Sequence, residues 1–136
     1  MAAALLKAHI LTTGIDPNPW IVESAGVRAD PGHPASPMAQ QVMAARSLDI
    51  SAHRSQKVSA ELLAGFDRIY CMEVGHLEVL ASAFPLWKER VMLLSQAAGR
   101  VENISDPYGG SLEDYQRTAQ QIEDCIKQSW VSFFEL

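Results

Sequence analysis

Short apolar runs alternate with segments of helical periodicity from residue 20 onward. The runs of strand length lie at 20–24, 66–72 and 90–94. Strands that alternate with crossover helices form a parallel sheet that is covered by helices. The pattern therefore predicts one α/β domain over residues 1–136, with three layers and an open parallel sheet that has helices on both faces.

Helices are predicted to begin at Ser36-Pro37, at residue 74 and at Ser111. Serine can cap the free amides of a first turn, and proline suits the first helical position. The spacing Ser111-x-x-Asp114 matches a capping box. The apolar positions that recur on one face, and that we expect in the core, are Met38, Val42, Ala45 and Leu48; then Leu77, Leu80 and Ala81; and finally Tyr115, Ala119, Ile122, Ile126 and Trp130.

Residues 2–13 predict a further helix, which is amphipathic and ends at Gly14. No strand precedes this helix, although a strand precedes each later helix of the scheme. The pattern therefore predicts that the chain begins halfway through a βα unit.

Composition narrows the class of protein. A chain of 136 residues with 48% hydrophobic residues can bury one core. A formal charge of −5 argues against a nucleic-acid partner. No apolar stretch approaches the roughly 20 residues that cross a bilayer. Two cysteines far apart, Cys71 and Cys125, argue against a disulfide framework and a thiolate metal site, and they favour a cytoplasmic location.

The segment Asp106-Pro107-Tyr108-Gly109-Gly110 is the densest local signal for chemistry. Taken alone, it is better interpreted as a turn, because Asp, Pro and Gly each suit turn positions. The alternative is that Asp106 presents a carboxylic acid to a cleft, where it protonates a leaving oxygen. That function requires a nucleophile and an anion site nearby.

Two polar segments could support such a site. Ser24-Ala25-Gly26 follows a predicted parallel strand, at the edge where open α/β sheets bind ligands, although a tight strand exit explains it equally well. His53-Arg54 could be polar support for the site or a solvated connection, and without context we favour the connection. A metal site on Glu73, His76 and Glu78 lacks a further ligand, so we predict neither metal nor cofactor.

Four segments, in order, resemble the low-molecular-weight protein tyrosine phosphatases and their bacterial arginine-phosphatase relatives over essentially the whole chain. The matching segments are Ser24-Ala25-Gly26, Ile50-Ser51-Ala52-His53-Arg54, residues 66–73 and residues 106–110. The resemblance implies that Asp106 is the general acid and that Ser24 and His53 help to hold the phosphate loop. Tyr108 could line a cleft that accepts an aromatic group.

The family's nucleophile lies in a Cys-x-x-x-x-x-Arg-Ser loop that binds phosphate and lowers the pKa of its thiol. Counting forward from the two cysteines of this chain places Leu77 and Val131 at the arginine position, so neither cysteine fits. Residues 1–7 resemble the segment that follows this loop. We therefore expect the first central strand and the phosphate loop to be missing. Strands 20–24 and 66–72 would then lie on either side of an unfilled strand position in the sheet.

Smaller departures lie near the expected site. Glu73 stands where the family usually has Asp, His76 where it often has Asn, and Val27 where Thr is common. These replacements predict altered polar contacts near the phosphate loop.

The resemblance implies a hydrolase that acts on a phosphorylated protein or a small phosphate monoester, with phosphotyrosine as the family's default substrate. We expect this chain to be inactive alone. One hypothesis is that the natural protein begins upstream and is an ordinary phosphatase. The alternatives are a complete non-catalytic binding or assembly module, in which a homodimer compensates for the missing strand, and a relative of the protein-arginine phosphatases.

Overall fold

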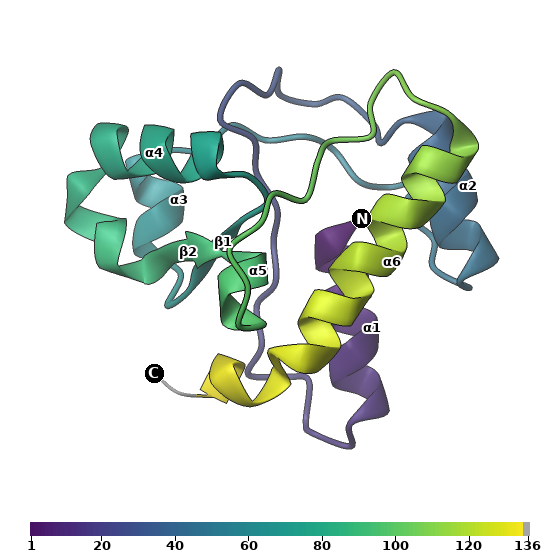
Figure 1. Cartoon of the computed structure of the whole chain (residues 1–136), viewed down its shortest axis with the longest axis horizontal. Helices are drawn as coiled ribbons and strands as arrows, with labels where there is room; N and C mark the ends of the chain where they lie inside the picture. Colours follow the sequence, from purple (N-terminus) through teal and green to yellow (C-terminus); the bar gives the residue numbers. More distant parts are fainter. Residues whose placement is uncertain (135–136) are drawn as a thin grey trace.

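The computed structural model describes residues 1–134 of the chain. Within them, no helix is long and apolar enough to cross a membrane. The elements in chain order are α1 (Ala2–Thr12), α2 (Pro37–Ala45), α3 (Ala60–Ala64), β1 (Ile69–Cys71), α4 (Val74–Ala83), the 3-10 helix η1 (Pro85–Arg90), β2 (Val91–Leu93), α5 (Leu94–Ala97), α6 (Leu112–Gln128) and the 3-10 helix η2 (Trp130–Phe134) (Figure 1).

The sheet consists of β1 and β2, which pair in parallel with Tyr70 opposite Met92. The chain between them forms α4 and η1, as a parallel connection requires. Both strands lie inside the runs predicted at 66–72 and 90–94, so these two predictions are confirmed with shorter bounds. The predicted α/β class, with a parallel sheet and helices, is also confirmed.

The predicted strand at 20–24 does not form a ladder within the described residues. Its backbone runs from a bond between Trp20 N and Pro17 O to an isolated parallel bridge between Gly26 and Lys57. Figure 1 shows this segment as a coil that crosses the middle of the molecule. A strand exists only where a neighbouring backbone accepts its hydrogen bonds, so apolar composition alone was not sufficient. The prediction of a strand here was wrong.

Alternate residues of β1 face two different apolar clusters, as the period of a strand requires. Tyr70, and Met72 directly after the strand, pack against a large cluster formed with α1, α2 and α6. Ile69 lies in the smaller cluster, whose buried members are Leu63, Cys71, Leu80 and Leu93. The small sheet is therefore covered on both faces.

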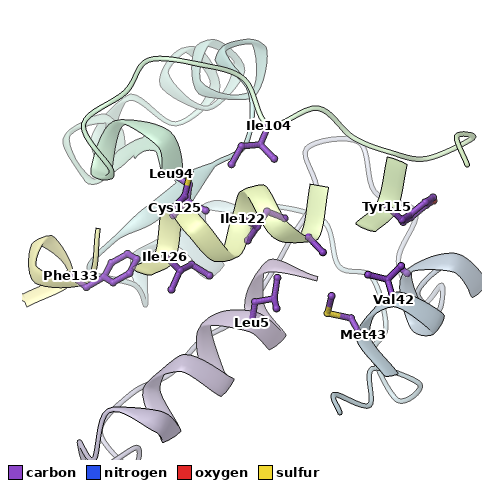
Figure 2. Close-up of a cluster of buried hydrophobic side chains, with 12 residues drawn as sticks. Leu5, Val42, Met43, Leu94, Ile104, Tyr115, Ile122, Cys125, Ile126 and Phe133 are labelled. Atoms are coloured by element: carbon purple, nitrogen blue, oxygen red, sulfur yellow. The ribbon is translucent and has the colours of Figure 1, made fainter. Parts of the chain in front are cut away.

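The long helix α6 supplies the largest share of the large cluster (Figure 2). Its first turn has the predicted capping box, in which Ser111 Oγ accepts from Asp114 N and the Asp114 carboxylate accepts from Ser111 N. Its buried residues are Tyr115, Ala119, Ile122, Cys125 and Ile126. The helix and its inner face are thus as predicted, except that Trp130 lies in η2 and Cys125 joins the buried stripe.

The helices α1 and α2 both contact α6, and α1 lies beside it in Figure 1. Ser36 caps α2 as predicted, since its Oγ accepts from Ala39 N. The predicted inner face of α2 was partly wrong. Met38 and Ala45 are exposed, and the buried residues are Ala39, Val42 and Met43. Contact with α6 selects a face rotated by about one residue from the one that the spacing suggested.

The first helix, α1, ends at Thr12, close to the predicted stop, and Gly14 follows with a φ of 74°. This left-handed conformation suits glycine, which has no Cβ. The end of α1 packs on an aromatic group, because the rings of His9 and Trp130 form a T-shaped contact with 4.6 Å between centroids. Trp20 stacks on the same indole at 6.0 Å. These rings join α1, residue 20 and η2.

We expect Ile122→Ala to lower the free energy of unfolding by about 2–5 kcal/mol, because it removes buried methyl groups and leaves a cavity beneath α6. Ile122 is 4% exposed. The measurement is urea denaturation followed by circular dichroism. Leu11→Ala is the control: Leu11 is 67% exposed, so a change within about 0.5 kcal/mol is expected. Equal losses in the two variants would contradict the assignment of the core.

Candidate active site

The loop that carries Asp106 is attached to the end of β1. Ile104 N donates to Met72 O at 2.8 Å, and the Ile104 side chain is buried in the large cluster. The side chain of Asn103 accepts from Val74 N at 2.8 Å through Oδ1. The loop therefore begins at the carboxyl edge of the parallel sheet, where α/β proteins place their ligands.

Asp106 is exposed and is fixed by two hydrogen bonds. Its backbone N donates to Glu73 Oε1 at 3.3 Å, and its own Oδ1 accepts from Tyr108 N at 3.0 Å. The second bond is the local turn that aspartate commonly makes. The turn itself thus holds the carboxylate at the surface. A turn at Asp106 and a carboxylic acid presented to a ligand are therefore compatible with the same geometry.

The remainder of this loop is compact and leads into α6. Gly110 N donates to Pro107 O at 2.8 Å. A Cβ on Gly110 would lie 2.6 Å from the Asp114 carboxylate and 2.9 Å from the Pro107 carbonyl, so the position requires glycine. Tyr108 projects from the same turn and is 80% exposed. An exposed ring beside a carboxylate can contact an incoming ligand.

The structure brings Ser24 and His53 together. Both line a cavity of about 150 Å³, whose other lining residues are Ala3, Lys7, Val22, Glu23, Arg54 and Gln56. Gln56 joins the segment of His53 to that of Ser24. Its side-chain Nε2 donates to Ser24 O at 2.9 Å, and its backbone carbonyl accepts from Gly26 N at 2.9 Å. Within the described residues, Asp106 and Tyr108 are not part of this lining.

Positive charge dominates the surroundings of His53. Partial removal of its ring from water lowers the pKa of His53, and the Met1 amine, the Arg54 guanidinium and the Lys7 ammonium lower it further. A lowered pKa leaves the imidazole mainly neutral at pH 7, because an unperturbed histidine already titrates near about 6.5. Burial and the nearby cations therefore favour the neutral form of the His53 ring.

Both cysteines are buried. Cys71 is 5% exposed in β1, and burial raises its pKa to about 11. Cys125 is 0% exposed in α6, and burial raises its pKa although Arg100 Nη2 lies 3.4 Å from its sulfur. Since the thiolate is the nucleophilic form, neither side chain has the exposure or the acidity of a catalytic cysteine.

The side chains that the sequence offered as metal ligands make other contacts or are exposed. Over residues 1–134, no three His, Cys, Asp or Glu side chains converge in a way that could hold a metal ion. The Glu73 carboxylate accepts from the Asp106 amide instead, and His76 and Glu78 are exposed on α4.

With this geometry established, comparison with known proteins identifies the family. Residues 1–133 match the family described as low molecular weight phosphotyrosine protein phosphatase. The chain belongs to this family. The resemblance stated from the four sequence segments is confirmed at this level, whereas the missing strand and phosphate loop remain predictions.

Individual relatives agree on the fold and differ in their named substrates. A protein-arginine-phosphatase of Bacillus subtilis is 30% identical over 94% of this chain and 83% of its own length. The probable low molecular weight protein-tyrosine-phosphatase EpsP of Ralstonia nicotianae is 32% identical over 96% of this chain and 83% of its own. The crystal structure of the low molecular weight protein tyrosine phosphatase from T. tengcongensis aligns with a TM-score of 0.89 and 31% identity, over 96% of this chain and 88% of that one.

Sequence reasoning located the candidate residues but missed two of their neighbours. Asn103 and Lys7 were not singled out, although the first contacts α4 and the second lines the cavity with His53. A signal existed for Asn103, since a polar residue directly precedes the buried Ile104 at the start of the loop. Lys7 offered none, because an exposed lysine on a helix is ordinary.

We expect Lys7→Met to raise the pKa of His53 toward its ordinary value, since it removes one of the positive charges that oppose protonation. The measurement is an NMR titration of the histidine ring protons, with His53→Gln to assign the signal. Lys57→Met is the control, because Lys57 is not among the charges that shift His53. A His53 midpoint that does not move in Lys7→Met would disprove the contribution of Lys7 to the lowered pKa.

Proposed function

We propose that this domain carries the leaving-group side of a low-molecular-weight phosphatase site, with Asp106 as the general acid. The observation that supports this role most directly is the attachment of an exposed Asp106 to the end of β1 through Glu73. Membership of the phosphatase family supports it independently. The substrate class is a phosphorylated protein or a small phosphate monoester.

The reaction requires a thiolate that attacks phosphorus while the bond to the leaving oxygen breaks. Asp106 donates its proton to that oxygen, and its carboxylate then accepts a proton from the water that displaces phosphate from sulfur. The two buried cysteines do not suit the first role. The nucleophile loop therefore has to come from a segment that this sequence does not contain, and the chain alone is expected to be inactive.

Ser24 and His53 are proposed to support that loop from the cavity that they share. The same lining carries two cations, Lys7 and Arg54, against the single carboxylate of Glu23, a balance that suits a neighbouring anion. Tyr108 is proposed to contact the leaving group, because its ring is exposed two residues from Asp106. An aromatic contact favours phosphotyrosine.

Phosphoarginine is the second candidate substrate, because the curated relatives include protein-arginine-phosphatases at 30% and 33% identity. The two substrates are distinguished by comparing kcat/KM on a phosphotyrosine peptide and on a phosphoarginine peptide of the same sequence. Both rates are measured with the loop-bearing fusion described next. The ratio decides between them only for a given phosphate loop, so the same loop is used throughout.

We expect no turnover of p-nitrophenyl phosphate by the chain alone, and turnover after fusion of a family strand and its Cys-x-x-x-x-x-Arg-Ser loop ahead of Met1. In that fusion, Asp106→Asn should lower kcat by about 10²- to 10⁴-fold, the usual contribution of general acid catalysis. The loss should be larger for phenyl phosphate, whose leaving oxygen is more basic.

The matched control is Asp67→Asn, because Asp67 is an exposed aspartate just before β1. Its rate should equal that of the parent fusion. Turnover by the unfused chain that falls in Asp106→Asn would refute the requirement for an external nucleophile. Equal rates in the Asp106→Asn and parent fusions would refute the general acid.

A non-catalytic assembly role is the alternative, and the edge of the sheet favours it. Within residues 1–134, β1 pairs only with β2, and residues 21–24 form no ladder. An unpaired edge strand is a template on which another chain can add a strand, so we propose that a second copy of this chain covers this edge.

We expect sedimentation equilibrium to give a dimer, and Val22→Pro to shift it toward monomer, because proline removes an N–H that could pair across the interface. Val22 N makes no hydrogen bond with the described residues. Val101→Pro is the control, as Val101 is 76% exposed in a loop. A monomeric parent chain at all concentrations would contradict the second copy as the occupant.

A further inference from the structure

Two segments that are far apart in the sequence exchange side-chain hydrogen bonds next to Asp106. Asn103, in the loop, accepts from the backbone N of Val74 at 2.8 Å. Glu73, which lies between β1 and α4, accepts from the backbone N of Asp106 at 3.3 Å. Each segment thus satisfies a backbone amide of the other with a side-chain oxygen.

The exchange replaces an ordinary helix cap. Val74 is the first residue of α4, and its amide has no partner inside the helix. Glu73 occupies the N-cap position but makes no side-chain bond to its own helix. Asn103 performs that capping from 29 residues away in the sequence, which leaves the Glu73 carboxylate available for the loop.

We propose that Glu73 and Asn103 act as positioning residues, forming a reciprocal clamp that holds the backbone of Asp106 against the end of β1. This inference rests on the proposed function, because positioning matters for catalysis only if Asp106 is the general acid. The geometry of the clamp can be measured without turnover.

The consequence for Asp106 is a restricted carboxylate. Its backbone is held by Glu73, and its Oδ1 accepts from Tyr108 N at 3.0 Å. No hydrogen bond from the described residues reaches its Oδ2, which leaves one oxygen for a proton and a leaving group. The backbone at the other end of this turn is fixed by the capping box of α6, which begins with Ser111. The clamp therefore acts at the end of the loop that α6 does not control.

The length of the Glu73 side chain is the feature that a substitution can test. Glu73→Asp keeps the negative charge but withdraws the oxygen by about one bond length from an amide at 3.3 Å. Glu73→Gln keeps the reach and an acceptor oxygen but removes the charge. If the clamp positions the loop, Glu73→Gln preserves it and Glu73→Asp does not.

The first measurement is amide hydrogen exchange by NMR on the full chain. We expect exchange at Asp106 to become roughly tenfold faster in Glu73→Asp, as for loss of a hydrogen bond, and to increase much less in Glu73→Gln, which keeps a neutral acceptor at the same reach. Asn103→Ala should do the same at Val74, and Asn103→Asp should restore protection. Glu78→Asp on α4 is the matched control, because Glu78 is exposed and lies on the same helix.

The second measurement distinguishes a direct bond from a general loosening. In an Asp106→Asn background, which removes the titration of that carboxyl group, the backbone amide proton at position 106 should shift with pH. The midpoint should equal that of the Glu73 carboxyl carbon, and the shift should vanish on addition of Glu73→Gln. A structural role without this bond would not produce the coupled titration.

Equal exchange rates in Glu73→Asp and Glu73→Gln would overturn the clamp. A pH-dependent shift of the amide proton at position 106 that persists after Glu73→Gln would overturn it as well. The proposed function fails by a separate result, namely a loop-bearing fusion whose rate is insensitive to Asp106→Asn. If the clamp is confirmed and that rate is insensitive, the clamp stands as a structural device and the general acid is lost.

Discussion

The burial of one face of α6 is the constraint on which the rest of the structure depends. This face contacts α1, α2 and α5, and it carries the largest share of the core residues drawn in Figure 2. Because α1, α2 and the last helix come from opposite ends of the sequence, their mutual contact fixes the topology. The same packing places Ser111, the N-cap of α6, immediately after the loop of Asp106.

The loop of Asp106 is therefore held between two elements with different origins of stability. Its end is fixed by α6, whose position follows from apolar burial. Its beginning is fixed by β1 and α4, through Ile104 and through polar exchange with Glu73. A loop that is anchored at both ends can present a carboxylate with little conformational freedom, which is a requirement for a group that has to meet a leaving oxygen at hydrogen-bond distance.

Periodicity predicted the elements that depend on their own residues and failed for those that depend on a partner. The capping box at Ser111 and the stripe below it are local, so the start of α6 and four of the five predicted inner residues were correct. The segment 20–24 has a strand-like composition but finds no ladder, because pairing requires a second backbone. The buried face of α2 was displaced because contact with α6, and not spacing alone, selects which residues turn inward.

The candidate site shows the same division. The turn at Asp106 could be predicted from its Asp, Pro and Gly residues. Its contact with Glu73 could not, because the two residues are 33 positions apart and meet only after β1 and the loop have been placed. The proximity of Ser24 and His53 likewise depends on Gln56, which joins their segments. Family resemblance suggested a shared role for these residues, but the contacts themselves required the fold.

Magnitudes explain why an exposed, well-anchored Asp106 does not by itself make a phosphatase. General acid catalysis contributes about 10²- to 10⁴-fold, which corresponds to roughly 3–5 kcal/mol of activation free energy. Enzymes commonly lower barriers by about 8–23 kcal/mol. The difference has to come from a thiolate nucleophile and from donors that stabilise the transferring phosphoryl group. The buried thiols of Cys71 and Cys125 supply neither, so the proposed role of Asp106 as proton donor requires a phosphate loop that completes the site.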